Sequence, residues 1–226
     1  MRILIIFLFL LISAQAIAKH EVGLSAINLS TTLTGTDKIT GGEGVLASNS
    51  NLFLGFSYTW FMTPRFHFRL NYYARKFKFI EDDGNIEGDE EINSNLQEVG
   101  LRFVAHRLVA FSILNVSETD VAFVVNTINK IELVSSSLSF LRLFYHQMLY
   151  SGRSVNIGFD IAYDLSASTD LIKNRNAKGA DFFMIFGKSQ AKFKVYGGTR
   201  IITKETDDLD FKQNNVYGGV DFSYLF

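Results

Sequence analysis

Several segments of this chain alternate between apolar and polar residues, which is the pattern of a β-strand with two different faces. The clearest covers residues 155–165, where the odd positions are apolar or aromatic and the even positions are Asn, Gly, Asp or Ala. Residues 51–60 and 66–75 alternate in the same way. Each segment has about ten residues, the length that a tilted transmembrane strand needs.

Soluble β-sandwiches also alternate, so further features must decide between the two architectures. The polar faces carry Gly, Ser, Asn and charged residues, which suits the narrow lumen of a closed barrel. Short connections alternate with long ones, and the chain ends with Val220, Phe222, Tyr224 and Phe226 at every second position. Together these features predict an all-β fold, a closed antiparallel transmembrane β-barrel.

The last seven residues, 220–226, resemble the terminal strand of small outer-membrane β-barrel proteins of Gram-negative bacteria. In that family the barrel-insertion machinery reads this pattern, and the final aromatic residue is its strongest element. The resemblance implies a location in the outer membrane, with outer-membrane lipid and the insertion machinery as partners. It also implies that both chain termini lie in the periplasm. It identifies no extracellular ligand.

The N-terminal residues have the pattern of an export signal. Arg2 precedes an apolar run from Ile3 to Ile12, and Ala16-Ile17-Ala18 matches a signal-peptidase site. As a helix the run reaches roughly 15 Å, too short for a membrane span. A buried N-terminal helix is the alternative. We therefore expect a signal peptide at 1–18 and a barrel at 19–226, and the absence of Cys excludes a lipoprotein anchor.

Turn residues and connection lengths predict ten strands, with eight or twelve as alternatives. The stretch 117–125 is ambiguous, and we interpret it as part of one tall hairpin that turns at 126–130. Three short turns are expected on the periplasmic side, at 62–65 with the only proline, at 150–152 and at 188–189. The longer connections are expected to be extracellular. The predicted strands lie near 20–33, 50–61, 65–79, 96–106, 107–117, 131–148, 153–165, 179–187, 190–202 and 214–226.

Composition narrows the function classes. The formal net charge of −1 gives no reason to expect a nucleic-acid partner, and zero Cys excludes disulfides and thiol catalysis. The 22 Phe residues need a core or a lipid contact, and no apolar run after the signal is long enough for a membrane helix. We expect a periplasmic aromatic belt of Trp60, Phe66, Tyr145, Tyr150, Phe186, Tyr224 and Phe226, and an outer belt that includes Tyr72, Tyr163 and Tyr217.

Charged residues on the inward faces are the main candidate site. Both signs occur in similar numbers, so the expected arrangement is an ion-pair network that closes the lumen, because an unpaired charge there is costly. A constricted polar pathway for small solutes is the alternative. The predicted inward charges are Arg69, Arg75, Glu98, Arg102, Arg142, Asp160, Asp164, Asp181, Lys192, Lys194, Arg200 and Asp221.

Two predicted extracellular loops are acidic, one between 81 and 91 and one from Glu205 to Asp210. Carboxylates are ligands for Ca²⁺ or Mg²⁺. Asp83, Asn85 and Glu87 partly match a calcium loop, but Ser94 stands where the bidentate Glu belongs. We therefore expect solvated loops, with no metal and no cofactor.

The four His residues argue against catalysis at the extracellular rim. His20, His67, His106 and His146 all fall toward the periplasmic ends of their predicted strands. A general base needs hydrogen-bond reach of its partner, and the acidic loops are at the other end. We therefore expect a protein that is not an enzyme, with a structural or surface-interaction role through its extracellular loops. A narrow channel is the second hypothesis and an outer-membrane enzyme the third.

Overall fold

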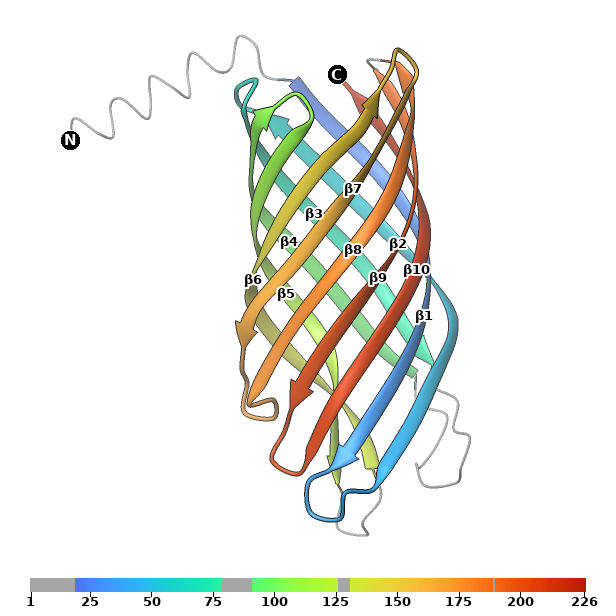
Figure 1. Cartoon of the computed structure of the whole chain (residues 1–226), viewed down its shortest axis with the longest axis vertical. Coiled ribbons are helices and arrows are strands. Elements are labelled where there is room, and N and C mark those ends of the chain that lie inside the picture. Colours follow the sequence, from blue (N-terminus) through green and yellow to red (C-terminus); the bar gives the residue numbers. More distant parts are fainter. Residues whose placement is uncertain (1–18, 79–90, 126–130, 189) are drawn as a thin grey trace, which may run out of the picture.

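In a computed structural model, the chain forms one closed antiparallel β-barrel (Figure 1). The structure describes residues 19–78, 91–125, 131–188 and 190–226, so the predicted signal peptide at 1–18 lies outside the described residues. The described part contains no helix with the length and apolar character that a membrane span requires.

The described residues form ten strands, and each pairs with its neighbours along the chain. β10 pairs with β1 to close the barrel, with Glu21 opposite Leu225 and Asp37 opposite Leu209. This confirms the predicted architecture and strand number. The strands are β1 (Lys19–Asp37), β2 (Glu43–Phe61), β3 (Phe66–Lys78), β4 (Glu91–His106), β5 (Val109–Val125), β6 (Ile131–Ser151), β7 (Val155–Ala167), β8 (Asn174–Lys188), β9 (Ala191–Glu205) and β10 (Leu209–Leu225).

One end of the barrel holds both ends of the described chain (Figure 1). The backbone N–H of His20 donates to the carbonyl of Phe226 at 3.0 Å. The turns here are short, and Thr63 closes the β2–β3 turn by accepting from the N–H of Phe66 at 2.9 Å, with Pro64 inside the turn. Following the family resemblance, we call this end periplasmic and the opposite end extracellular.

The strands are taller than the sequence predicted, and the extracellular connections are correspondingly shorter. β1 continues to Asp37 instead of ending at 33, and β2 begins at Glu43 instead of 50. Glu205 ends β9 and Asp210 lies in β10, so the predicted acidic loop at 205–210 is a turn of residues 206–208. The ambiguous stretch 117–125 belongs to β5, which pairs as far as Val125 with Ile131, so the tall hairpin is confirmed.

The outward face changes polarity along the strands. On β1, Leu24 is 64% exposed, whereas the outward positions above it are Asn28, Ser30 and Thr32. On β6, Leu143 and Leu141 are exposed, and the outward positions beyond them are Ser139, Ser137 and Ser135. An exposed apolar band next to the periplasmic end therefore meets the lipid, as in outer-membrane barrels with a band about 25 Å tall. We call this part the membrane half and the part above it the extracellular extension.

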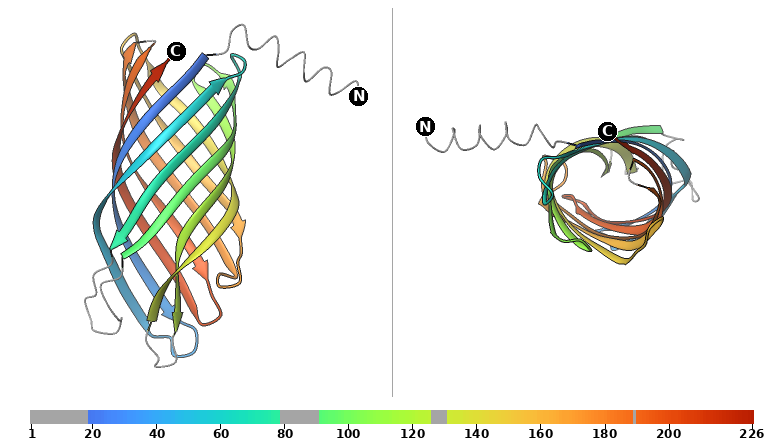
Figure 2. Two further views of the ribbon diagram at one scale, coloured as in Figure 1. Left: turned by 180° about the vertical axis from the view of Figure 1, so that it is seen from behind. Right: turned by 90° about the horizontal axis from the view of Figure 1, so that it is seen from above.

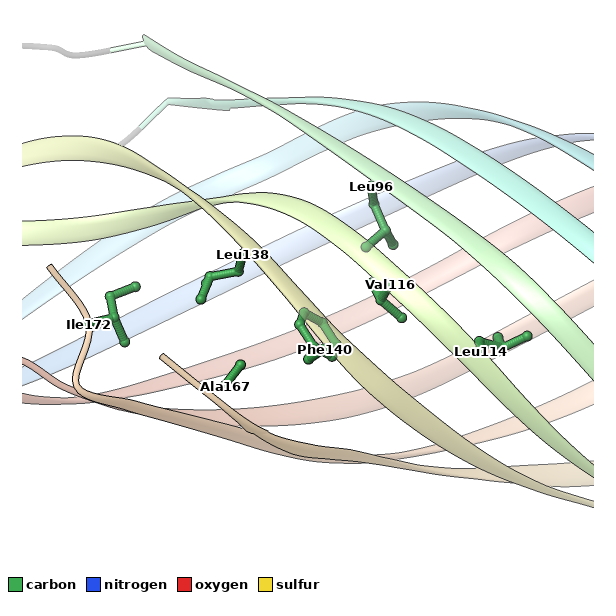
Figure 3. Packing of buried hydrophobic residues seen from close by; sticks show 7 residues of the cluster. All are labelled: Leu96, Leu114, Val116, Leu138, Phe140, Ala167 and Ile172. Atoms are coloured by element: carbon green, nitrogen blue, oxygen red, sulfur yellow. The ribbon is translucent and has the colours of Figure 1, made fainter. Parts of the chain in front are cut away.

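The inward face changes in the opposite sense. In the membrane half β1 turns Glu21, Gly23 and Ser25 inward, while in the extension it turns Leu29 and Leu33 inward. Two buried apolar clusters result. One joins Leu29, Leu33, Leu46, Phe53, Leu209 and Phe211, and the other joins Leu96, Leu114, Val116, Leu138, Phe140, Ala167 and Ile172 (Figure 3). The extension thus has an apolar core and a polar outer face, as a soluble barrel does.

Steep strand tilt places residues from distant strands at the same height (Figure 2). A tilted closed sheet shifts its register continuously around the barrel, so neighbours across the lumen are far apart in sequence.

One of the predicted positions in the aromatic belts is wrong. Tyr217 was expected in the outer belt, but it lies on the inward face of β10, packs against the first apolar cluster and donates a hydrogen bond to Asp181. Along β10 the even-numbered residues, such as Val216 and Val220, face outward, so the odd-numbered Tyr217 faces the lumen.

Candidate functional site

Ion pairs cross the lumen at mid-height, where the membrane half meets the extension. Asp164 on β7 is the centre, and it is 1% exposed. It accepts from Arg142 Nε at 2.6 Å and from Arg175 Nη1 at 2.9 Å, and Arg200 also donates to it. A carboxylate with three guanidinium partners from β6, β8 and β9 ties one side of the wall together.

Two further carboxylates continue the network to the opposite wall. Glu118 on β5 accepts from Arg175 Nη2 at 2.9 Å and from Arg75 Nη1 at 2.9 Å. Glu98 on β4 pairs with Arg142 and accepts from Asn71 Nδ2 at 2.8 Å. We call these residues, contributed by every strand from β3 to β9, the mid-lumen network: Arg75, Glu98, Glu118, Arg142, Asp164, Arg175 and Arg200.

A polar ladder extends the closure across β9, β10 and β1. Lys204 Nζ donates to Gln213 Oε1 at 3.0 Å, and Gln213 Nε2 donates to Asn215 Oδ1 at 3.0 Å. Thr31 Oγ1 donates to the same Asn215 oxygen at 2.9 Å. Buried polar groups are stable in such a place only when their hydrogen bonds are satisfied. The ladder meets this condition next to the mid-lumen network.

Above the network, the β7–β8 connection covers the lumen. Ile172 is fully buried in the second apolar cluster, against residues of β5 and β6 (Figure 3). The hydroxyl groups of Thr169 and Ser136 on β6 form a hydrogen bond of 3.2 Å, and Thr169 Oγ1 accepts a hydrogen bond from the N–H of Ile172 at 3.0 Å. Arg175 lies over the ring of Phe140 at 4.2 Å, which couples this cover to the ion pairs below it.

Three extracellular turns are joined by exposed ion pairs. Lys38 in the β1–β2 turn contacts Glu205 at 2.9 Å and Asp210 at 3.3 Å, and these carboxylates raise the pKa of the lysine. Lys173 pairs with Asp207, and the lysine lowers the pKa of that carboxyl group. Three of the four carboxylates of the second acidic group, Glu205, Asp207 and Asp210, are therefore paired with lysines within the fold.

The periplasmic half of the lumen, which we call the vestibule, is lined differently. Its charged side chains are partly exposed, whereas five of the seven residues of the mid-lumen network are buried. His146 Nδ1 lies 2.6 Å from Asp160 Oδ1, and the His146 ring stacks on the ring of Phe183. Asp160 Oδ2 lies 3.6 Å from Lys194 Nζ. This His–carboxylate pair was missed, because the predicted turn at 150–152 does not place residue 146 opposite residue 160. In the structure a bulge between Met148 and Tyr150 shifts the register, and the two residues are directly opposite each other.

The extracellular extension has two shallow hollows on its outer surface. One, of about 390 Å³, is lined by outward residues of β7 to β10, namely Tyr163, Asn176, Lys178, Ile201, Thr203 and Lys212. The other, of about 450 Å³, lies beside it, shares three of these residues and reaches Thr34 and Glu43 on β1 and β2. Both linings combine hydroxyl, amide and charged groups with apolar side chains, Ile201 in the first hollow and Phe211 in the second.

The structure places the twelve predicted lumen charges on inward-facing positions of their strands, but it divides them between two groups. Arg75, Glu98, Arg142, Asp164 and Arg200 meet at mid-height, and Lys192 pairs with Glu21 near the periplasmic end. Glu118 and Arg175 were not predicted to face the lumen. The predicted strand 107–117 ended before Glu118, and the predicted strand 179–187 began after Arg175. The remaining predicted charges, Arg69, Arg102, Asp160, Asp181, Lys194 and Asp221, lie in the vestibule or at its upper end.

Other predicted sites fall elsewhere. Asp83, Asn85 and Glu87 lie outside the described residues, and no group of three metal-binding side chains occurs within them. Val220, Phe222 and Tyr224 lie on the lipid-facing side of β10, with Phe226 directly after the strand, and all are exposed. Recognition of this segment by the insertion machinery stays a prediction.

Comparison with solved structures finds outer-membrane barrels. Outer membrane protease OmpT from Escherichia coli aligns with a TM-score of 0.56 and 9% identity, covering 92% of this chain and 96% of its own. LpxR from Salmonella typhimurium aligns with a TM-score of 0.45 and 10% identity, covering 91% of this chain and 100% of its own. The NanC porin aligns with a TM-score of 0.42 and 10% identity, covering 91% of this chain and 98% of its own. No family model and no curated protein matches the sequence. At such low identity the OmpT likeness shows a shared fold, and it transfers no residue role.

The comparison nevertheless corrects one prediction. We expected a protein that is not an enzyme, yet the barrel aligned at a TM-score of 0.56 is a protease. The distance between the His residues and the extracellular carboxylates does not exclude a His–carboxylate pair elsewhere, because His146 and Asp160 pair inside the vestibule. The fold, the exposed apolar band and the likeness to OmpT agree on the rest: the protein is an integral β-barrel of the bacterial outer membrane.

Proposed function

We propose that this protein is a non-conducting barrel that acts at the cell surface, through the polar outer face of its extracellular extension. The observation that carries the proposal is the mid-lumen network. Its Asp164, Glu118 and Arg175 residues are between 0 and 2% exposed, and the side chains of Arg75 and Arg200 are 12% exposed, which supports a lumen that is largely closed at that height. A solute would have to separate several buried ion pairs, and breaking one such pair costs about 3–5 kcal/mol.

The extension supports the second part of the proposal. Its Ser, Thr and Asn side chains face outward, above the height at which lipid covers the wall. Both hollows open on this surface, and the ends of the strands are held together by the Lys38 and Lys173 ion pairs. A rigid polar surface on paired strands positions ligand contacts more accurately than long loops do. The interaction role that we expected of loops is thus assigned to the strands.

Single-channel recording tests the closed lumen. Refolded protein in a planar bilayer is expected to give no conductance steps, because the network and Ile172 block the pathway. A double variant, Arg142→Ala with Arg175→Ala, removes the two arginines that bridge the carboxylates and is expected to conduct. Lys212→Ala, on the outer surface, is the matched control and stays silent. Regular steps from the wild type would contradict the proposal and favour the narrow-channel alternative.

Labelling of intact cells tests the exposed outer face. The chain has no Cys, so single cysteines can be introduced without a background. Thr203→Cys in the hollow of the extension is expected to react with a membrane-impermeant maleimide. Phe222→Cys, on an exposed position of the lipid-facing band, is expected to react only after the membrane is dissolved. Equal labelling of both positions on intact cells would mean that the band is not embedded where we place it.

A further inference from the structure

Two arginines of the vestibule differ from all those at mid-height. Arg69 on β3 and Arg102 on β4 both lie on inward positions of adjacent strands. Arg102 is directly opposite His67, and Arg69 is opposite Gly100, two residues along β4 from Arg102. Basic groups that are cross-strand or diagonal neighbours on one face repel one another. The sequence therefore places like charges side by side in a narrow lumen.

Neither arginine has an ion-pair partner among the described residues. Arg75, Arg142, Arg175 and Arg200 each contact at least one carboxylate. For Arg69 and Arg102 the described residues provide no carboxylate within 4.0 Å, and Arg102 Nε is buried without a hydrogen-bond partner. A buried guanidinium nitrogen without an acceptor is unfavourable, and such groups in native proteins usually have a ligand, ion or water.

The carboxylates that share the vestibule have other partners. Glu21 pairs with Lys192, and Asp160 is held by His146 at 2.6 Å and Lys194 at 3.6 Å. Asp181 accepts from Tyr217 at the upper end. Asp221 on β10 differs, because its Oδ1 is buried without a hydrogen-bond partner. Glu21 and Asp160 also attract Arg102 electrostatically, so these three carboxylates are the internal competitors for the arginines in the described part of the lumen.

The residues opposite the two arginines supply further donors. Ser112 on β5 is opposite Arg102, and Thr59 on β2 is opposite Arg69. Both arginines are partly exposed while facing the lumen, so solvent-accessible space adjoins them. Two guanidinium groups with neighbouring hydroxyls match the planar, multidentate geometry of an oxyanion.

We propose that Arg69 and Arg102 form an anion-binding site in the vestibule, which takes a small oxyanion bearing phosphate or carboxylate groups from the periplasmic side. The site lies below the closed mid-lumen network, so binding does not require transport. The inference is independent of the surface role proposed above, because the two involve opposite ends of the barrel and different residues.

Thermal unfolding with inorganic phosphate tests the site. Refolded wild-type protein in detergent micelles, at constant ionic strength, is expected to show a saturable rise in melting temperature. Arg102→Gln and Arg69→Gln remove a charge-assisted contact and are expected to weaken phosphate binding by about tenfold or more. Arg107→Gln, in the exposed β4–β5 turn, keeps the full effect and controls for net charge.

A second variant separates the anion site from internal pairing. If Asp221 neutralises the arginines in solution, the wild type will show no saturable response and Asp221→Asn will create one. That result would overturn the proposal. If the site is open, Asp221→Asn is expected to bind phosphate at least as tightly as the wild type. An identical response in the wild type and Arg102→Gln would likewise overturn it, by showing that phosphate acts elsewhere.

Discussion

The membrane half and the extracellular extension are built from the same ten strands but have opposite polarity. In the membrane half Leu24 and Phe222 face outward while Glu21 and Asp221 face inward. In the extension Thr32 and Lys212 face outward while Leu33 and Phe211 are buried inside. In each half the outer face matches the surrounding medium, which is lipid in the membrane half and water in the extension. Strand alternation therefore determines which residues share a face, whereas the surroundings determine which face is apolar.

The junction between the two halves should be the most sensitive region, because charges are buried there on every side. Arg142→Ala removes the partner that Glu98 and Asp164 share, and it leaves two buried carboxylates with fewer positive contacts. We expect a loss of about 3–5 kcal/mol of unfolding free energy. Reversible unfolding in urea, with refolded protein in micelles, measures it. Lys212→Ala serves as the control, and a change within about 0.5 kcal/mol is expected there.

The extension should depend on its core as a soluble protein does. Leu138 is 1% exposed in the second apolar cluster, whereas Leu141 on the same strand is 45% exposed to lipid. We expect Leu138→Ala to cost about 2–5 kcal/mol, because it opens a cavity. Leu141→Ala is expected to cost less, since lipid fills the space. The same urea titration compares the two variants, and a larger loss for Leu141→Ala would contradict the polarity of the extension.

A charge on the outer face should distinguish the halves along a single strand. Leu24→Arg places a cation in the lipid-facing band and is expected to destabilise the folded barrel by about 2–4 kcal/mol in bilayers. Thr32→Arg faces outward on the same strand, in the extension, and is expected to change stability by about 0.5 kcal/mol or less. Folding yield in lipid vesicles is a convenient readout. Similar losses for both variants would place the lipid boundary higher than we do.

The smallest expected effect is the pH response of the turns. The pKa of Asp207 lies below its ordinary 3.8 because of Lys173, so this pair stabilises the turns above that pH and is lost as the pH falls through the lowered value. The pKa of Lys38 lies above its ordinary 10.5, so its pairs are present below that pH and are lost at higher values. The protection factors of the N–H groups of Lys38 and Lys173, measured by hydrogen exchange relative to an unstructured amide at the same pH, are expected to be highest between these limits. Lys173→Ala should remove the acidic limb.

Much of the fold was predictable because it depends on local features of the sequence, namely strand alternation and turn residues. A period of two determines that Phe159 and Asp160 face opposite sides wherever the strand lies. Turn residues such as Pro64 separate the strands, and the number of alternating segments predicts ten of them. The upper strand ends were missed because the prediction stopped each strand at the height of a membrane. In residues 29–37 and 205–213 the alternation continues with the apolar face turned inward.

The partners inside the lumen are different, because they depend on the closed and tilted barrel. Glu118 contacts Arg75, 43 residues away, and Arg175, 57 residues away, and no local pattern carries those pairings. The register of all the intervening strands decides that Asp164 pairs with three arginines, while Arg69 and Arg102 have no carboxylate partner among the residues that the structure describes. Because strand alternation and turns are local, the sequence predicted a closed barrel of about ten strands and the inward positions of most of them. Only the tertiary structure decided which charges neutralise one another, because ion pairing depends on distances of a few ångströms across the lumen.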